Sequence, residues 1–314
     1  MDTSGFVIGV DGGGSKTLGE VADLHGTTVA TAAVGPTNPN VVGVEESVRT
    51  LCDLIRHLCD LASCRPGDLQ GIALGLAGGG GEKIQEEIRE KVTRGLHEAG
   101  KLDPPVQVVT DVRIALEGAF GGRAGIGVVA GTGSSIMYKT EQGDVGLIGG
   151  WGRILGDEGS GYFIGLEALR AVMRDYDGAS HAKALCEALS SRFGLDSRYR
   201  IIEAVYRQQF SIPSLAPIIL EFASKSDEVS CGILKRAAAL LADQVETALS
   251  HMGDSSVRVV LTGGLVEHDT SYKPILVSEL VHRFPRIRIQ APQFSPVQGA
   301  VMMALSQSRE ERGA

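Results

Sequence analysis

Residues 6–17 read Phe-Val-Ile-Gly-Val-Asp-Gly-Gly-Gly-Ser-Lys-Thr, an apolar run that ends in an acid, three glycines and short polar side chains. A second stretch of the same kind, at residues 126–135, reads Ile-Gly-Val-Val-Ala-Gly-Thr-Gly-Ser-Ser. Turns of this composition expose backbone N–H groups that can surround a phosphate, because glycine lets the backbone approach closely. Two such turns facing one polyphosphate predict a nucleotide cleft between two similar halves.

The residues after the first glycines distinguish this turn from other phosphate loops. Residues 16–23 alternate with a period of two, which predicts a returning strand. A dinucleotide-binding turn would open a helix instead, and a P-loop would need a lysine directly after Gly14, where Ser15 stands. Either turn alone would be an ordinary hairpin turn, whereas the pair, with Asp11 at the end of the first strand, favours phosphate binding.

The composition is that of a globular α/β protein with many tight turns. The chain has 314 residues, of which 43% are hydrophobic and 42 are glycine, and it is long enough for two domains. Its formal net charge of −8 makes a nucleic acid or an anionic membrane an unexpected partner. The five cysteines form no C-x-x-C pair and are typical of free thiols. With no signal-peptide pattern and no apolar run near ~18 residues, we expect a cytoplasmic protein.

Strands and helices follow the same order in both halves of the chain. In the first half, we expect strands at 6–10, 16–23, 28–34, 72–77 and 106–110, and helices at 44–63, 84–96 and 114–120. In the second half, we expect a hairpin at 126–139, strands at 145–148, 257–261 and 287–289, a mainly helical stretch at 159–252 and a closing helix at 296–305. This order predicts two α/β domains with mostly parallel central sheets and ligands at the carboxyl ends of the strands.

The domain boundary is expected near residue 122. The N-terminal domain would span 1–122, joined by the C-terminal helix 296–308, and the C-terminal domain would span 123–295 with the helical insertion 159–252.

The most specific segment is residues 149–165, which read Gly-Gly-Trp-Gly-Arg-Ile-Leu-Gly-Asp-Glu-Gly-Ser-Gly-Tyr-Phe-Ile-Gly. With this segment, the duplicated order and the two hairpins, the chain resembles the sugar kinase, heat-shock chaperone and actin superfamily. Within it, the chain is most similar to the N-acetylglucosamine and glucosamine kinases of the BadF/BadG/BcrA ATPase-like group. The resemblance extends from Asp11 to the helix at Gln298–Ala300 and implies two duplicated ribonuclease H-like domains with an interdomain cleft.

The resemblance implies ATP-dependent phosphorylation of the 6-hydroxyl of an amino sugar, with ATP and Mg²⁺ as cofactors. N-acetylglucosamine or glucosamine is the expected acceptor, and N-acetylmannosamine stays open because one loop substitution can resize the pocket around the 2-substituent. We also expect a homodimer. The alternative function is that of the ATPase activator of a 2-hydroxyacyl-CoA dehydratase, which carries an iron–sulfur cluster between subunits. That activator needs cysteines placed to share a cluster, and none of the five lies near the second hairpin.

The nucleotide-side residues come from the hairpins and a later glycine pair. Asp11 is expected to hold Mg²⁺ through water, with an Asx turn as the alternative. Lys16 is either a phosphate ligand or a solvated hairpin residue. The expected nucleotide-binding residues are Gly13, Gly14, Ser15, Lys16, Thr17, Gly131, Thr132, Gly133, Ser134, Gly263 and Gly264.

The remaining candidates act on the acceptor sugar. Asp111, at a strand end, is either a helix cap or the general base that the resemblance implies. Asp157 and Glu158 are expected in the first turn of a helix, where the resemblance assigns Asp157 to sugar hydroxyls. Glu158 would contact the amide side of the sugar or orient Asp157. The other expected sugar-site residues are Asn38, Gly150 and Trp151, the last either stacked on the sugar or packed in the core.

Overall fold

The structure is a computed structural model that describes residues 5–65, 67–100, 103–179, 182–253 and 256–313. The chain forms two compact units, one from residues up to 123 together with the segment from 291 onward, the other from residues 124–290. None of the helices in the described ranges combines the length and apolar character that a membrane span requires.

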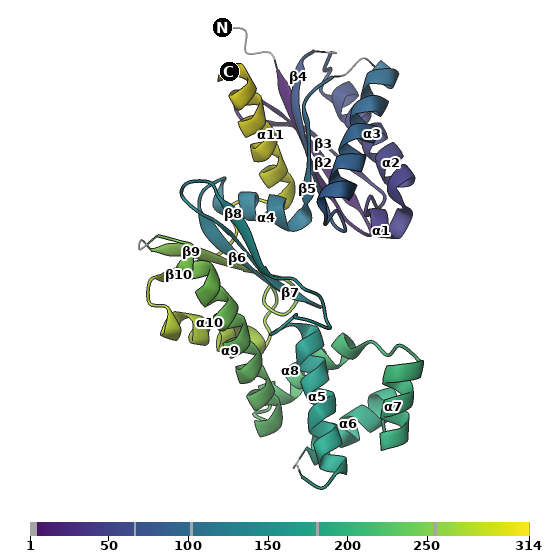
Figure 1. Ribbon diagram of the computed structural model, residues 1–314, viewed down its shortest axis with the longest axis vertical. Coiled ribbons are helices and arrows are strands. Elements are labelled where there is room, and N and C mark those ends of the chain that lie inside the picture. The colour runs from purple at the N-terminus through teal and green to yellow at the C-terminus, as the bar shows by residue number, and fades with distance from the viewer. Residues whose placement is uncertain (1–4, 66, 101–102, 180–181, 254–255, 314) are drawn as a thin grey trace. The chain divides into compact units, whose positions relative to one another are not determined.

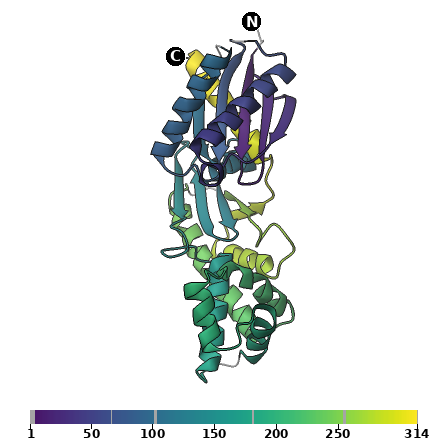
Figure 2. The same cartoon turned by 90° about the vertical axis from the view of Figure 1, so that its right-hand side faces the viewer.

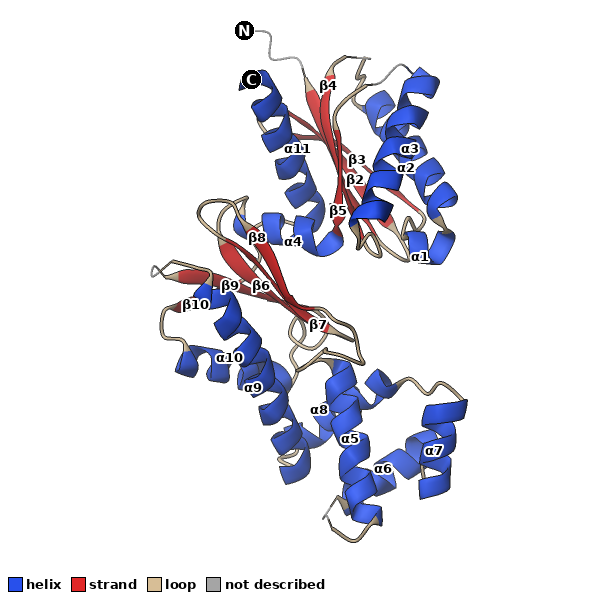
Figure 3. Cartoon of the chain, viewed as in Figure 1, coloured by secondary structure: helices blue, strands red, loops and turns tan. Residues whose placement is uncertain are grey.

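The first unit is a five-stranded sheet between two layers of helices (Figure 3). Its strands run in the order β3-β2-β1-β4-β5, with β1, β2 and β3 antiparallel and β1, β4 and β5 parallel. The strands are β1 (Phe6–Gly12), β2 (Thr17–Asp23), β3 (Thr28–Val34), β4 (Leu69–Leu76) and β5 (Val106–Thr110). The helices are α1 (Pro39–Val42), α2 (Val44–Leu61), α3 (Glu82–Gly100), α4 (Asp111–Phe120) and α11 (Pro296–Gly313).

Apolar stripes decide which helix covers which face. Helices α2 and α3 pack side by side on one face, where Leu51, Ile55, Ile88 and Val92 are fully buried (Figures 1 and 2). On the other face lies α11, which crosses α4 at very short range. A β-carbon at Gly299 would lie 2.0 Å from a carbonyl oxygen of α4, so the two helix backbones are in direct contact.

The second unit repeats the strand order of the first. Its sheet runs β10-β9-β6-β7-β8, and β6 to β10 correspond to β1 to β5 in position and direction. The strands are β6 (Gly125–Ala130), β7 (Ser134–Lys139), β8 (Val145–Gly149), β9 (Val257–Thr262) and β10 (Ile287–Gln290). This identity of connectivity confirms the duplication that the sequence predicts.

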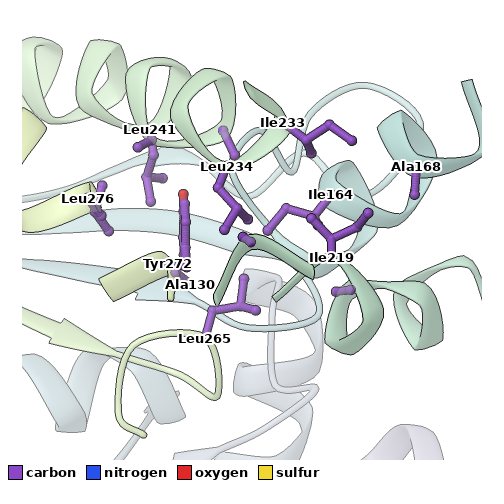
Figure 4. Close-up of a cluster of buried hydrophobic side chains, with 14 of the residues drawn as sticks. Ala130, Ile164, Ala168, Ile219, Ile233, Leu234, Leu241, Leu265, Tyr272 and Leu276 are labelled. Carbon is purple, nitrogen blue, oxygen red and sulfur yellow. The ribbon is translucent and has the colours of Figure 1, made fainter. Parts of the chain in front are cut away.

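The stretch between β8 and β9 is mainly helical, as expected. It contains α5 (Gly161–Tyr176), α6 (Lys183–Phe193), α7 (Arg198–Arg207), the 3-10 turn η1 (Ile212–Leu215), α8 (Ala216–Ser224) and α9 (Glu228–Ser250), and α10 (Tyr272–Arg283) follows β9. Figure 4 shows Leu234 and Leu241 of α9 in the same buried cluster as Tyr272 of α10 and Ile164 of α5. This cluster joins the inserted helices to the sheet.

One short helix is absent from the sequence-based expectation. The sequence predicts no strand or helix between residues 34 and 44, whereas α1 begins at Pro39. Its N-cap is Asn38, whose side chain accepts a hydrogen bond from the Asn40 N–H, and proline is favoured at the first helical position. Gly43, at φ 80°, ends the helix after one turn.

Candidate functional site

The first group of candidate residues lies where β1, β4 and β5 end. Asp11, near the end of β1, is half-buried and pairs with Gly75 of β4. Burial raises the pKa of Asp11, and the negative charge of Asp111 raises it further, while Lys16 lowers it. The two acids are therefore close enough to repel each other at one edge of the sheet.

Asp111 is not the cap of its helix. Thr110 is the N-cap of α4, since its hydroxyl accepts a hydrogen bond from the Arg113 N–H, and Asp111 is the first helical residue. The helix thus begins three residues earlier than the expected start at residue 114, and the capping role considered for Asp111 is wrong. The Asp111 Oδ1 accepts a hydrogen bond from its neighbour, the Val112 N–H, at 2.9 Å.

The first hairpin presents a four-residue turn, 13–16, closed by a hydrogen bond from the Gly13 N–H to the Lys16 carbonyl. Gly14, Ser15 and Lys16 are exposed. Thr17 differs from them, because it is fully buried and its hydroxyl bonds to the Thr37 hydroxyl at 2.8 Å. The structure therefore places the Thr17 side chain beneath the turn, away from its exposed side.

Asn38 lies beside this hairpin. The N–H groups of Thr37 and Asn38 both donate to the Gly13 carbonyl, at 3.1 and 3.2 Å. On its other side, a β-carbon at Gly78 would lie 2.3 Å from the Asn38 Oδ1. The structure thus brings Asn38 to the same strand-end edge of the first unit as the hairpin.

The second group of candidates surrounds the hairpin between β6 and β7. Its turn, 131–133, is one residue shorter than the first, and Thr132 is exposed. The Ser134 N–H donates to the Asp157 Oδ1 at 3.2 Å, and the Ser134 hydroxyl donates to the Glu158 carbonyl at 2.7 Å. A β-carbon at Gly133 would lie 2.9 Å from the Asp157 Oδ1, so the absence of a side chain there lets the carboxylate approach the turn.

The sequence predicts Asp157 and Glu158 in the first turn of a helix. In the structure, both residues precede the helix. Helix α5 begins at Gly161, with Ser160 as the N-cap that accepts from the Phe163 N–H. Asp157 has a φ of 62°, a left-handed conformation that Asp adopts more readily than most residues. The first two N–H groups of α5 donate hydrogen bonds to the hairpin turn. The Gly161 N–H donates to the Gly131 carbonyl, and the Tyr162 N–H donates to the Thr132 carbonyl.

The later glycine pair packs on the base of this hairpin. Gly263 has a φ of 100°, and a β-carbon there would lie 2.6 Å from the Ala130 carbonyl oxygen. The Ala130 carbonyl accepts a hydrogen bond from the Leu265 N–H at 3.1 Å. Gly263, Gly264 and the second hairpin, all expected nucleotide contacts, are therefore neighbours.

The glycine-rich loop before Asp157 is open to solvent. Gly150 is exposed, and Trp151 is 75% exposed, so the core-packing alternative for Trp151 is wrong. Ile154 and Leu155 in the same loop are 86% and 76% exposed.

A family model, that of the BadF/BadG/BcrA/BcrD ATPase family, matches residues 8–304. The chain belongs to this family. The resemblance inferred from the hairpins and the segment 149–165 is therefore confirmed.

Curated relatives of this family member cover almost its whole length. It is 32% identical to the N-acetylmuramic acid/N-acetylglucosamine kinase of Clostridium acetobutylicum, over 96% of this chain and 99% of the relative. It is 27% identical to the N-acetyl-D-glucosamine kinase of Dictyostelium discoideum, over 96% and 98%. A solved Chromobacterium violaceum protein assigned as an N-acetylglucosamine kinase matches with a TM-score of 0.68 and 26% identity, over 96% of this chain and 99% of that protein.

Sequence reasoning missed one residue of the second group. Gln244 of α9 donates from Nε2 to the Glu158 Oε2 at 2.8 Å, across 86 residues of sequence. The available signal was a polar residue next to the apolar stripe of α9, between Leu241 and Val245.

Proposed function

We propose that this family member transfers the γ-phosphoryl group of ATP to the 6-hydroxyl of an amino sugar, N-acetylglucosamine or glucosamine. One observation carries the proposal. Asp157, assigned to sugar hydroxyls, lies within hydrogen-bond distance of the Ser134 N–H, assigned to phosphate. A phosphotransferase needs its acceptor subsite directly beside its phosphate subsite, because the attacking oxygen must reach the γ-phosphorus.

The family and the relatives support this reaction. The kinases named above are amino-sugar kinases that match this chain over nearly their full lengths, in agreement with the activity expected from the sequence. ATP use accords with membership of an ATPase family.

Asp111 is the proposed general base. It would take the proton of the 6-hydroxyl as the sugar oxygen bonds to the γ-phosphorus, while the bond to the β,γ-bridging oxygen breaks and ADP leaves with its electron pair. Since Thr110 caps α4, the Asp111 carboxylate is not required for capping.

The residues around Asp11 suit a magnesium ion. Mg²⁺ is commonly held by one or two carboxylates together with substrate phosphates and water, and two mutually repelling acids gain from a cation beside them. Asp11 would hold the ion, which when bound neutralises charge on the transferring phosphates. Lys16 and the exposed glycines of the first hairpin would add phosphate contacts.

Asp157, Glu158 and Asn38 would bind polar groups of the sugar, and Gly150 and Trp151 would contact the sugar as well. Trp151 is exposed and therefore able to meet a ligand. Carboxylates that bind hydroxyls discriminate strongly against analogues that lack those hydroxyls, because the buried polar groups would be left unpaired.

The cysteines give no support to the activator alternative. Cys52 and Cys59 are buried in α2, and the other three lie after α2, in α6 and in α9. None of them belongs to a hairpin.

A panel of free amino sugars with coupled detection of ADP tests the proposal. We expect ADP release that depends on N-acetylglucosamine or glucosamine, abolished by Asp111→Asn and unaffected by Asp103→Asn, which changes an exposed acid. Release of ADP from ATP without any amino sugar, together with iron-derived absorbance of the protein, would favour the activator function instead. Light scattering on the same preparation tests the expected homodimer.

A further inference from the structure

Glu158 is fixed at two points. Its main-chain carbonyl accepts from the Ser134 hydroxyl at 2.7 Å, and its carboxylate accepts from the Gln244 side chain at 2.8 Å. The first contact belongs to the hairpin, whereas the second comes from α9 in the helical insertion.

Helix α9 contacts the 149–161 segment through one face. A β-carbon at Gly159 would lie 2.8 Å from both the Ala237 carbonyl oxygen and the Leu241 Cβ. Gln244 follows Leu241 by three residues and Ala237 by seven, so all three lie on the same side of the helix. A β-carbon at Gly149 would lie 2.6 Å from the Gln244 Oε1. The Gln244 amide therefore touches residues at both ends of the stretch from Gly149 to Glu158.

The orientation of this amide follows from its partner. Nε2 faces the Glu158 carboxylate, because the flipped amide would set one acceptor against another. In this orientation the Gln244 Oε1 is buried and has no hydrogen-bond partner among the described residues. Such an atom costs free energy that an apolar side chain would avoid, so packing alone does not account for a glutamine here.

We propose that Gln244 is a positioning residue that holds the Glu158 carboxylate for the acceptor sugar. This inference rests on the proposed function, in which Glu158 contacts the sugar. Gln244 touches no reacting atom, and its effect passes entirely through Glu158.

Gln244→Met keeps the length of the side chain and removes the donor. We expect the KM for N-acetylglucosamine to rise about tenfold or more, because hydrogen bonds to charged groups are the stronger ones. The KM for ATP and the kcat at saturating sugar should stay within about twofold of the unmodified protein. Gln244→Glu should raise the sugar KM further, since it sets a like charge against Glu158. The matched control, Asp243→Asn, changes the neighbouring exposed side chain of α9 and should leave both KM values unchanged.

A double-mutant cycle separates positioning from a general structural role. In the Glu158→Ala background, Gln244→Met should have no further effect on the sugar KM, because its only route of action is gone. Trp151 is the only tryptophan of the chain and lies in the same segment, so its fluorescence gives the sugar Kd independently of turnover.

An equal loss from Gln244→Met in both backgrounds, or an unchanged sugar Kd and KM, would overturn the inference while leaving the proposed function intact. A protein that neither binds nor phosphorylates any amino sugar would overturn both. If Gln244→Met lowers the Tm by more than a few degrees, the double-mutant cycle with Glu158→Ala is carried out with the isosteric Gln244→Glu variant instead.

Discussion

Neutralising Asp157 should affect the two ligands in opposite directions. In the structure the Asp157 carboxylate accepts from the Ser134 N–H, the amide that we assign to phosphate. A phosphate oxygen using that amide would come near a like charge unless Asp157 moves to the sugar. Asp157→Asn should therefore bind ATP more tightly than the unmodified protein when no sugar is present, and should bind the sugar more weakly.

The expected changes in the two binding free energies follow from the charge repulsion and the hydrogen bonds that the substitution removes. Two unit charges about 4 Å apart repel by about 1 kcal/mol in water and by about 4 kcal/mol at an effective dielectric constant near 20. Asp157 is half-buried, so we take about 1–2 kcal/mol, which corresponds to roughly 5- to 30-fold tighter ATP binding. Loss of charged hydrogen bonds to sugar hydroxyls, at about 1.5–3 kcal/mol, weakens sugar binding roughly 10- to 150-fold.

Calorimetric titration with magnesium and a non-hydrolysable ATP analogue measures the first effect, and titration with N-acetylglucosamine measures the second. Glu141→Gln removes the same charge from an exposed turn and controls for the net charge of the protein. An ATP affinity of Asp157→Asn that equals or falls below that of the control would refute the idea that this carboxylate competes with phosphate.

Three further substitutions test residues of the first unit, and one of them has two expected outcomes. Asp111→Asn should lower turnover by about 10²- to 10⁴-fold while ATP binding by calorimetry stays unchanged, and a variant that keeps most of its kcat would remove Asp111 from the mechanism. Because folding raises the pKa of Asp11, the ionised carboxylate costs stability at a pH above that pKa. Asp11→Asn should therefore raise the Tm at neutral pH and give no gain near pH 3, where the carboxyl is protonated in the folded and the unfolded chain. The same variant should need more Mg²⁺ and turn over every sugar more slowly, and an effect confined to one sugar would contradict the metal role. Gly299→Ala should lower the Tm by roughly 3–10 °C, because its β-carbon would lie 2.0 Å from the Ile114 carbonyl oxygen, whereas Gly253→Ala, with open space around it, should change the Tm little.

The succession of strands and helices along the chain, and its repetition in the second half, could be predicted from the sequence because they depend on local signals. Alternation in residues 16–23 and the paired glycine turns both act over a few residues, and both hairpins form as expected. The start of α4 was misplaced because the apolar pattern that begins at Ile114 marks the packed face of the helix and not its first residue. The start of α5 was misplaced because Asp157 and Ser160 both suit a helix N-terminus, and packing against the Gly131 carbonyl selects Ser160.

Other features of the site depend on contacts between distant residues. Nothing local to Thr17 indicates that its hydroxyl meets Thr37, and nothing near Glu158 indicates Gln244. The family resemblance supplied the candidate acids, but the hydrogen bonds that hold Asp157 and Glu158 come from segments whose approach only the folded chain defines.

The position of α11 has a consequence for synthesis on the ribosome. Its buried residues Val301 and Ala304 share a core with Val7 and Ala73, which are translated long before them. At about 5–20 residues per second, residues 124–290 take roughly 10 to 30 s to emerge, and during that time one face of the first sheet lacks its covering helix. The second unit can therefore complete its fold before the first, and the nascent N-terminal segment presents an apolar surface of the kind that chaperones bind.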